Sequence, residues 1–214
     1  MYKKKSLFVT FEGIEGSGKS YLSKKLFFSL KRRKIPVIHT REPGGTKNAE
    51  KIREIILDDY FDSKNSIKFD KYTDTLLYLA ARNEHIINKI APAVLKKKII
   101  ICDRFVDSTL AYQVHGKNVS KNFVDTIHKH ILGNIKPDLT FILKVNISIA
   151  MKRLNMRKKK NRYDKFSKKF YIRAQNAFVK IAKKNKKRYV LLNNSTDTKD
   201  IEKIIFNKVI KVLN

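Results

Sequence analysis

The chain has 214 residues, 42% of them hydrophobic, and this length predicts one domain with a substantial core rather than two. No apolar run approaches the roughly 20 residues that cross a bilayer, and the N-terminus lacks the apolar region of a signal peptide. We therefore expect a cytoplasmic protein without a membrane partner. The single cysteine, Cys102, excludes an internal disulfide. The formal net charge of +30 comes from lysines scattered along the chain, so nucleic acid is not an expected partner.

Short β-prone runs alternate with helical patterns along the chain. The runs that predict strands cover residues 7–11, 36–40, 98–102, 138–145 and 188–192. Apolar spacing and capping residues predict helices over residues 21–31, 49–58, 73–89, 120–132 and 197–213. The third of these helices is expected to reach toward Pro92, and the fourth to have a serine cap and to stop at Gly133. This alternation predicts an α/β fold, a doubly wound five-stranded parallel sheet with helices on both faces.

The stretch GIEGSGKS, residues 13–20, fits the phosphate-binding pattern G-x-x-x-x-G-K-[ST] between a predicted strand and a predicted helix. The pattern predicts that ATP phosphates are held by the loop residues Gly13, Ile14, Glu15, Gly16, Ser17, Gly18, Lys19 and Ser20. Lys19 would reach the β and γ oxygens, and the Ser20 hydroxyl would help to hold Mg²⁺. These features place the chain among folds of the P-loop NTPase type. The carboxylate of Glu15 is unexpected in a loop that binds anions.

Other charged residues follow the second and third predicted strands, where ligands gather in parallel sheets. Arg41 precedes the turn-rich EPGG and would face a second phosphate. Asp103 ends the third strand at the place of an acid that holds the metal through water, and Arg104 beside it would bind an anion. On the helix at 73–89, Tyr78 and Arg82 lie four residues apart and share one face, which suits stacking and hydrogen bonding of a base.

Five separated stretches together resemble the thymidylate kinases, which phosphorylate dTMP to dTDP with ATP and Mg²⁺. In chain order they are FEGIEGSGKS, TREPGGT, LLYLAARNEHI, DRFVDSTLAYQ and PDLTFIL. The resemblance covers essentially the whole chain. It implies a single nucleoside monophosphate kinase domain over residues 1–214, a step of dTTP synthesis as the function, and a homodimer.

The resemblance also implies how the phosphate and sugar of dTMP are held. Glu15 would hold the 3′-hydroxyl of the sugar, while Arg41 and Arg104 would grip the acceptor phosphate. Tyr112 would lie by the sugar, where a ribose 2′-hydroxyl would clash.

For the base, the resemblance implies that Tyr78 stacks on thymine and that Arg82 bonds its O4 edge. Thr109 and Gln113 would lie beside the base.

Lys19 and Arg104 are expected to act in catalysis together with an arginine from a short lid at about residues 157–164. A loop that carries Glu15 and no arginine resembles the bacterial subtype, in which the lid supplies this cation. Arg157 and Arg162 are the two candidates.

Three other functions remain open from the residues alone. Another nucleoside monophosphate kinase, for dUMP, CMP or a deoxynucleoside, would be favoured if Tyr78 and Arg82 pointed into the core. A basic nucleic-acid-binding protein with a vestigial loop would have no need of the intact Lys19 and Ser20. A P-loop switch protein would carry an Asn-Lys-x-Asp motif, which this chain lacks.

Overall fold

A computed structural model describes residues 6–57, 69–158, 162–195 and 199–213. Its centre is a five-stranded sheet with the order β2-β3-β1-β4-β5, in which every neighbouring pair is parallel. The strands are β1 (Leu7–Glu12), β2 (Val37–Arg41), β3 (Ile99–Asp103), β4 (Leu139–Lys144) and β5 (Tyr189–Asn193). All five predicted strands are confirmed, each within one residue at both ends, and so is the doubly wound parallel fold.

The central strands are apolar along their whole length because both faces of the sheet are covered. All six residues of β1 and all five of β3 are buried. The strand register pairs Phe11 with Asp103 and Asp103 with Arg41. The carboxyl ends of β1, β3 and β2 therefore lie side by side at one edge of the sheet, where the phosphate-loop pattern begins.

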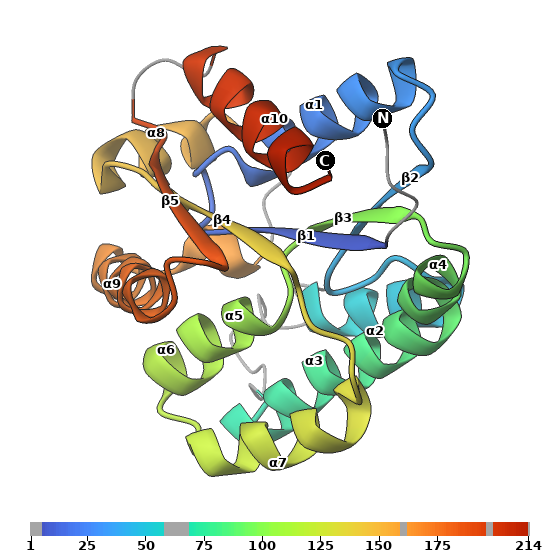
Figure 1. Cartoon of the computed structure of the whole chain (residues 1–214). Helices are drawn as coiled ribbons and strands as arrows, with labels where there is room; N and C mark the ends of the chain where they lie inside the picture. Colours follow the sequence, from blue (N-terminus) through green and yellow to red (C-terminus); the bar gives the residue numbers. More distant parts are fainter. Residues whose placement is uncertain (1–5, 58–68, 159–161, 196–198, 214) are drawn as a thin grey trace.

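Helices cover the two faces of the sheet in separate layers, as Figure 1 shows. One face packs against α1 (Lys19–Arg32) and α10 (Lys199–Leu213), which share a core cluster with Val9 and Phe11. The helices on the other face are α2 (Lys47–Leu57), α3 (Lys71–His85), α7 (Lys121–Leu132) and α9 (Lys168–Lys184). Alternate residues of β1 thus face opposite layers, since Phe8 belongs to a different cluster from Val9.

The predicted helix at 73–89 does extend past Pro92, but not as one uniform α-helix. It runs from α3 through a π-helical turn, η1 (Ile86–Ile90), into α4 (Ala91–Leu95). Pro92 lies in the first turn of α4, where its missing N–H costs no helical hydrogen bond. The helix predicted at 120–132 is confirmed as α7. The Ser120 side chain accepts a hydrogen bond from Phe123 N, and Gly133 ends the helix.

Two parts of the chain form helices where none was delimited from the sequence. The first contains α5 (Val106–Thr109), the π-helical turn η2 (Leu110–Val114) and α6 (His115–Lys117). The second contains α8 (Ile147–Asn155), the 3₁₀ turn η3 (Arg162–Lys165) and α9. Of these elements, α9 packs against β4 and β5.

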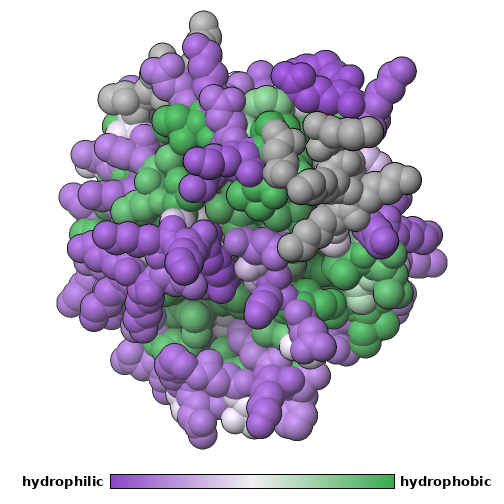
Figure 2. All heavy atoms as spheres, viewed as in Figure 1, coloured by the Kyte–Doolittle hydropathy of each residue, from purple (hydrophilic) through white to green (hydrophobic). Residues whose placement is uncertain are grey.

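The surface is mainly hydrophilic, and Figure 2 shows apolar side chains between the hydrophilic ones on one face. Among the described residues, Leu95 and Met156 are the most exposed large hydrophobic side chains, at 82% and 76%. No helix in the described part of the chain combines the length and the apolar character needed to cross a membrane.

Candidate active site

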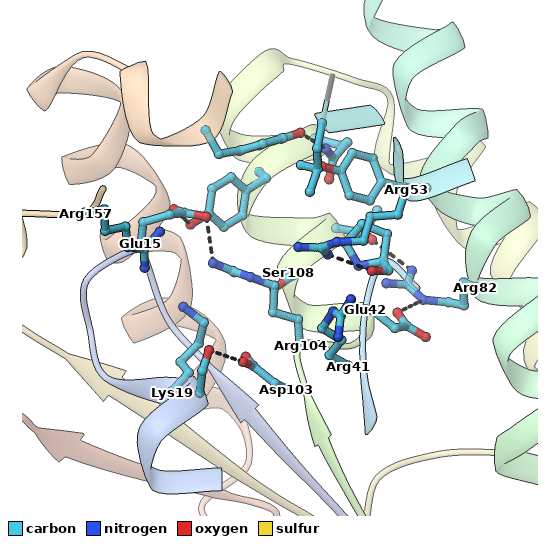
Figure 3. A pocket seen from close by; sticks show the side chains of 18 residues that line it. Glu15, Lys19, Arg41, Glu42, Arg53, Arg82, Asp103, Arg104, Ser108 and Arg157 are labelled. Carbon is cyan, nitrogen blue, oxygen red and sulfur yellow. Dashed lines mark hydrogen bonds and ion pairs between the residues drawn. The ribbon is translucent and has the colours of Figure 1, made fainter. Parts of the chain in front are cut away.

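A pocket opens at the carboxyl edge of the sheet, where the ends of β1, β2 and β3 meet α3 and the 106–117 segment (Figure 3). The predicted site residues that line it are Glu15, Lys19, Ser20, Arg41, Tyr78, Arg82, Asp103, Arg104, Thr109, Tyr112, Gln113 and Arg157. Residues from six separate segments therefore converge on one cavity. The side chain of Arg162, the other lid candidate, lies outside the described residues, as do residues 159–161 of the predicted lid.

The phosphate-loop residues 13–18 connect β1 to α1 in a conformation that needs glycine. Gly16 has φ of 73° and Gly18 has φ of 90°, both in the left-handed region. A Cβ on Gly16 would also lie 2.6 Å from the Ala150 carbonyl oxygen, and one on Gly18 would strike the Asn194 side chain. The two glycines are thus required both by the backbone turn and by the close packing behind it.

Two side chains that the sequence analysis did not predict hold the loop from behind. Arg153 of α8 donates to Gly16 O at 3.0 Å, and the Asn194 amide after β5 donates to Ser17 O at 2.7 Å. Both loop carbonyls are therefore satisfied on the side away from the pocket. No pattern around either residue indicates this contact, because each lies more than 130 residues from the loop in sequence.

Lys19 lies under the loop with its side chain almost fully enclosed. Its Nζ donates to Ile14 O at 2.8 Å, and the residue is 5% exposed. Burial, and then the nearby charge of Arg104, lower the pKa of Lys19 to about 8. The site therefore holds an ammonium group that would be stabilised by an incoming anion.

Ser20 and Asp103 face each other beside Lys19. The Ser20 hydroxyl donates to Asp103 Oδ2, while Asp103 Oδ1 is buried without a hydrogen-bond partner among the described residues. A hydroxyl oxygen and a carboxylate oxygen are suitable ligands for a hard divalent cation. The unpartnered oxygen fits the metal position predicted from the sequence.

The carboxylate of Glu15 turns away from Lys19, toward the opposite side of the pocket (Figure 3). It accepts hydrogen bonds from Arg104 Nη2 at 2.7 Å and from the Tyr112 hydroxyl. Arg104 also donates from Nη1 to Gly13 O and Ser108 Oγ, each at 3.1 Å, and its own backbone is left-handed with φ of 72°. The acid in the loop thus has a guanidinium counter-ion instead of facing the phosphate positions.

Arg82 forms the deepest polar wall of the pocket and is only 2% exposed. Its Nε donates to Glu42 Oε2 at 2.7 Å, and its Nη2 donates to Phe105 O at 3.0 Å. Glu42 in turn accepts from His85 Nδ1 at 3.0 Å. Both Arg82 and Tyr78 line the pocket. A kinase for another nucleotide would be favoured if these two side chains pointed into the core, and they do not.

Aromatic rings close one end of the pocket. Tyr78 packs edge-on against Tyr163 with ring centroids 6.0 Å apart, and Tyr112 packs against Tyr163 at 5.8 Å. Gln113 Nε2 lies 3.5 Å from the Tyr163 hydroxyl. A planar ligand beside Tyr78 would therefore meet an apolar surface whose rings are already fixed by packing.

The predicted arginines at the mouth of the pocket are more exposed than those inside. Arg41 pairs with Glu50 at 2.8 Å, and its side chain is 50% exposed. Arg157 pairs with Asp164 at 2.7 Å, with 42% of its side chain exposed. The Arg41 pair is screened by water and contributes little to stability, whereas the Asp164 side chain is fully buried. Both guanidinium groups are themselves about half exposed and accessible to an anionic ligand.

Several residues that line the pocket were not predicted. They are Glu42, Pro43, Arg53, Leu57, Ser108 and Tyr163. Arg53 lies on α2, whose charged sequence indicates only a solvated helix, yet it donates to Pro43 O at 2.7 Å. Glu42, Ser108 and Tyr163 each adjoin a predicted residue in sequence, which is the one signal that could have identified them.

Comparison with known proteins agrees with this geometry. A family model described as thymidylate kinase matches residues 11–205. A thymidylate kinase of Mycoplasma capricolum is 39% identical over 97% of this chain and 94% of its own, and one of Ehrlichia chaffeensis is 37% identical over 97% and 98%. The crystal structure of the E. chaffeensis thymidylate kinase superposes with a TM-score of 0.73 at 33% identity, covering 98% of this chain and all of that one. The chain therefore belongs to the thymidylate kinase family.

Proposed function

We propose that the pocket transfers the γ-phosphoryl group of ATP to the phosphate of dTMP, which yields dTDP and ADP in a step of dTTP synthesis. One observation carries this proposal: two different sets of polar side chains line the two sides of a single cavity. Lys19, Ser20 and Asp103 gather on one side, while Glu15 and Arg104 face the other. Such a cavity holds two phosphorylated ligands with their phosphates adjacent.

The donor ATP would lie along the loop at residues 13–20. Its β and γ oxygens would accept hydrogen bonds from the loop N–H groups and from Lys19, whose burial strengthens the attraction. Ser20 and Asp103 would hold Mg²⁺. When bound, this ion neutralises charge on the β- and γ-phosphates. The side chains of Lys19 and the arginines add positive charge where negative charge spreads during transfer.

The acceptor would be oriented by the opposite wall. Arg41 and Arg104 would bind the phosphate of dTMP, so that one of its oxygens attacks the γ-phosphorus while the bond to the β-phosphate breaks. Glu15 accepts two protein hydrogen bonds, which leaves carboxylate lone pairs for the sugar 3′-hydroxyl. Tyr112 would lie beside the same sugar.

The thymine ring would lie against Tyr78, with its polar edge toward the wall formed by Arg82, Thr109 and Gln113. All three wall residues are buried, at 1% to 2% exposure, so an unmatched polar group on the base would go unsolvated. This arrangement favours a base over a simple phosphate ester as the acceptor.

A lid at about residues 157–164 would close over the phosphates and exclude water. Arg157 or Arg162 would then supply the cation that the loop itself lacks. Arg157 lines the pocket with 42% of its side chain exposed, which makes it available for this role.

The substrate assignment is tested by measuring ADP release with ATP and Mg²⁺ for dTMP, dUMP, CMP and GMP. We expect dTMP to have the highest kcat/KM of the four. A preference for any of the other three acceptors would overturn the assignment of the base site.

The chain would act as one catalytic domain, residues 1–214, within a cytoplasmic homodimer, as the resemblance implies. The single cysteine is buried and free, which suits a reducing compartment. Sedimentation velocity at micromolar concentration should give a mass near twice the 25.0 kDa of one chain, and a monomer would contradict this part.

A further inference from the structure

His128 lies behind the base wall on α7, far from every motif that predicts the site. Its Nε2 is 2.7 Å from Arg82 Nη1, and the residue is 8% exposed. Burial, and then the charge of Arg82, lower the pKa of His128 to about 3. The imidazole is therefore neutral, with its proton on Nδ1, and Nε2 accepts a hydrogen bond from the guanidinium.

The hydrogen bonds of Arg82 account for nearly all of its donors. Nε donates to Glu42, Nη1 donates to Thr109 and His128, and Nη2 donates to Phe105 O. A guanidinium has five N–H groups, and these contacts use four of them. Because the group is planar and held on three sides, the direction of the remaining Nη2 proton is fixed. Within the described residues it has no protein acceptor, and it belongs to a side chain that lines the pocket.

Thr109 adds a second donor to the same wall. Its hydroxyl oxygen accepts from Arg82 Nη1 at 2.8 Å, so its own proton points elsewhere. Thr109 is 1% exposed and lines the pocket. A base that presents an acceptor here, such as a 4-oxo pyrimidine, is complementary to this wall. A 4-amino pyrimidine would instead place a donor against donors in a buried site, which costs affinity.

We propose that His128 is a positioning residue for base selectivity. Its Nε2 accepts a hydrogen bond from Arg82 Nη1 and so fixes the orientation of the guanidinium. In this orientation the wall favours a 4-oxo over a 4-amino pyrimidine. The inference rests on the proposed function of the pocket. Without the His128 acceptor, one buried N–H of Arg82 is unpaired, and the orientation of the guanidinium is less tightly fixed because one of its four contacts is lost.

The test compares three variants in steady-state kinetics with dTMP and with dCMP. His128→Leu removes the acceptor, His128→Gln keeps an amide oxygen near the position of Nε2, and His130→Leu changes an exposed histidine of the same helix. We expect His128→Leu to raise the KM for dTMP about tenfold and to reduce the preference for dTMP over dCMP by about the same factor. The KM for ATP should stay within about twofold. His128→Gln should restore most of the preference, and His130→Leu should behave as the unchanged enzyme.

Each outcome distinguishes the inference from the function on which it rests. An unchanged enzyme that does not phosphorylate dTMP would overturn both. An active enzyme whose His128→Leu variant loses thermal stability but keeps its dTMP preference would overturn the inference alone. If that variant does not fold, nitrogen-15 NMR of the unchanged protein decides the matter. We expect a neutral His128 with its proton on Nδ1 at pH 7, and a protonated ring or a proton on Nε2 would refute the role.

Discussion

The two halves of the pocket differ in how far the protein itself satisfies their charges. The phosphate half comprises the loop at 13–20 with Asp103. It keeps a buried lysine of lowered pKa, and two of its buried oxygens, Ser17 Oγ and Asp103 Oδ1, have no hydrogen-bond partner in the described part of the chain. The base half, comprising Glu42, Arg82, Thr109 and His128, is a nearly complete hydrogen-bond network. The phosphate half needs charged ligands to become electrostatically balanced. The base half is already ordered before a ligand binds, so that it can discriminate among bases.

The largest effect is expected in the base half, from removing the charge of Glu42. Its ion pair with Arg82 is buried on both sides, at 4% and 3% exposure, so Glu42→Gln leaves an uncompensated guanidinium in the core. We expect the free energy of unfolding to fall by about 3 to 5 kcal/mol, as measured by urea denaturation.

The matched control is Glu50→Gln, which neutralises the acid of the exposed pair with Arg41. The loss there should be below about 1 kcal/mol, because water already screens that pair. Equal losses for the two variants would mean that the base half is no more dependent on its internal charges than the surface is.

In the phosphate half, we expect a change of rate without a loss of stability. Lys19→Met removes a cation that has to be desolvated in the folded protein, so the free energy of unfolding should not fall. The kcat should decrease by about 10²-fold to 10³-fold, since one charge that stabilises the transition state is lost. Coupled kinetics and thermal denaturation measure the two quantities.

Lys25→Met serves as the control, because Lys25 is an exposed residue of the same helix. It should alter neither quantity by more than the experimental scatter. A Lys19→Met enzyme that is both active and destabilised would reverse the contrast between the two halves.

The same contrast explains what could be predicted from the sequence. The phosphate half comes from one contiguous loop and the end of one strand, so a local pattern identifies Lys19, Ser20 and Asp103. The side-chain partners of Arg82 are 27, 40 and 46 residues away from it in sequence. Their proximity arises from packing of α3 against α7, the 106–117 segment and the end of β2, which spacing along the chain does not reveal.

The helices that were not predicted from the sequence include those of the 106–117 segment and α9. In the segment at 106–117, Asp107, Thr109 and Gln113 are buried polar residues, and this obscures the apolar periodicity on which the prediction of a helix depends. The α9 helix does keep apolar residues such as Phe170, Ala174 and Phe178 at helical spacing, so its signal was present among the lysines. The strands were predictable because the central ones are apolar on both faces.

The pKa of Lys19 gives the phosphate half a pH dependence above pH 8, whereas the lowered pKa of His128 places that of the base half below pH 6.5. In the folded protein this pKa is about 8, against an ordinary value of 10.5. Between these pH values the unfolded chain binds the proton and the folded chain has released it, so stability rises with pH in this window. Relative to Lys19→Met, the free energy of unfolding should increase by up to about 3 kcal/mol from pH 8 to pH 10.5. Urea denaturation of both proteins across this range measures the difference, in which the other titrating groups cancel. Saturating ADP should abolish the difference, because the phosphate anions favour the protonated lysine in the folded state. A difference that is flat with pH in the ligand-free protein would mean that the loop already neutralises Lys19 without a nucleotide.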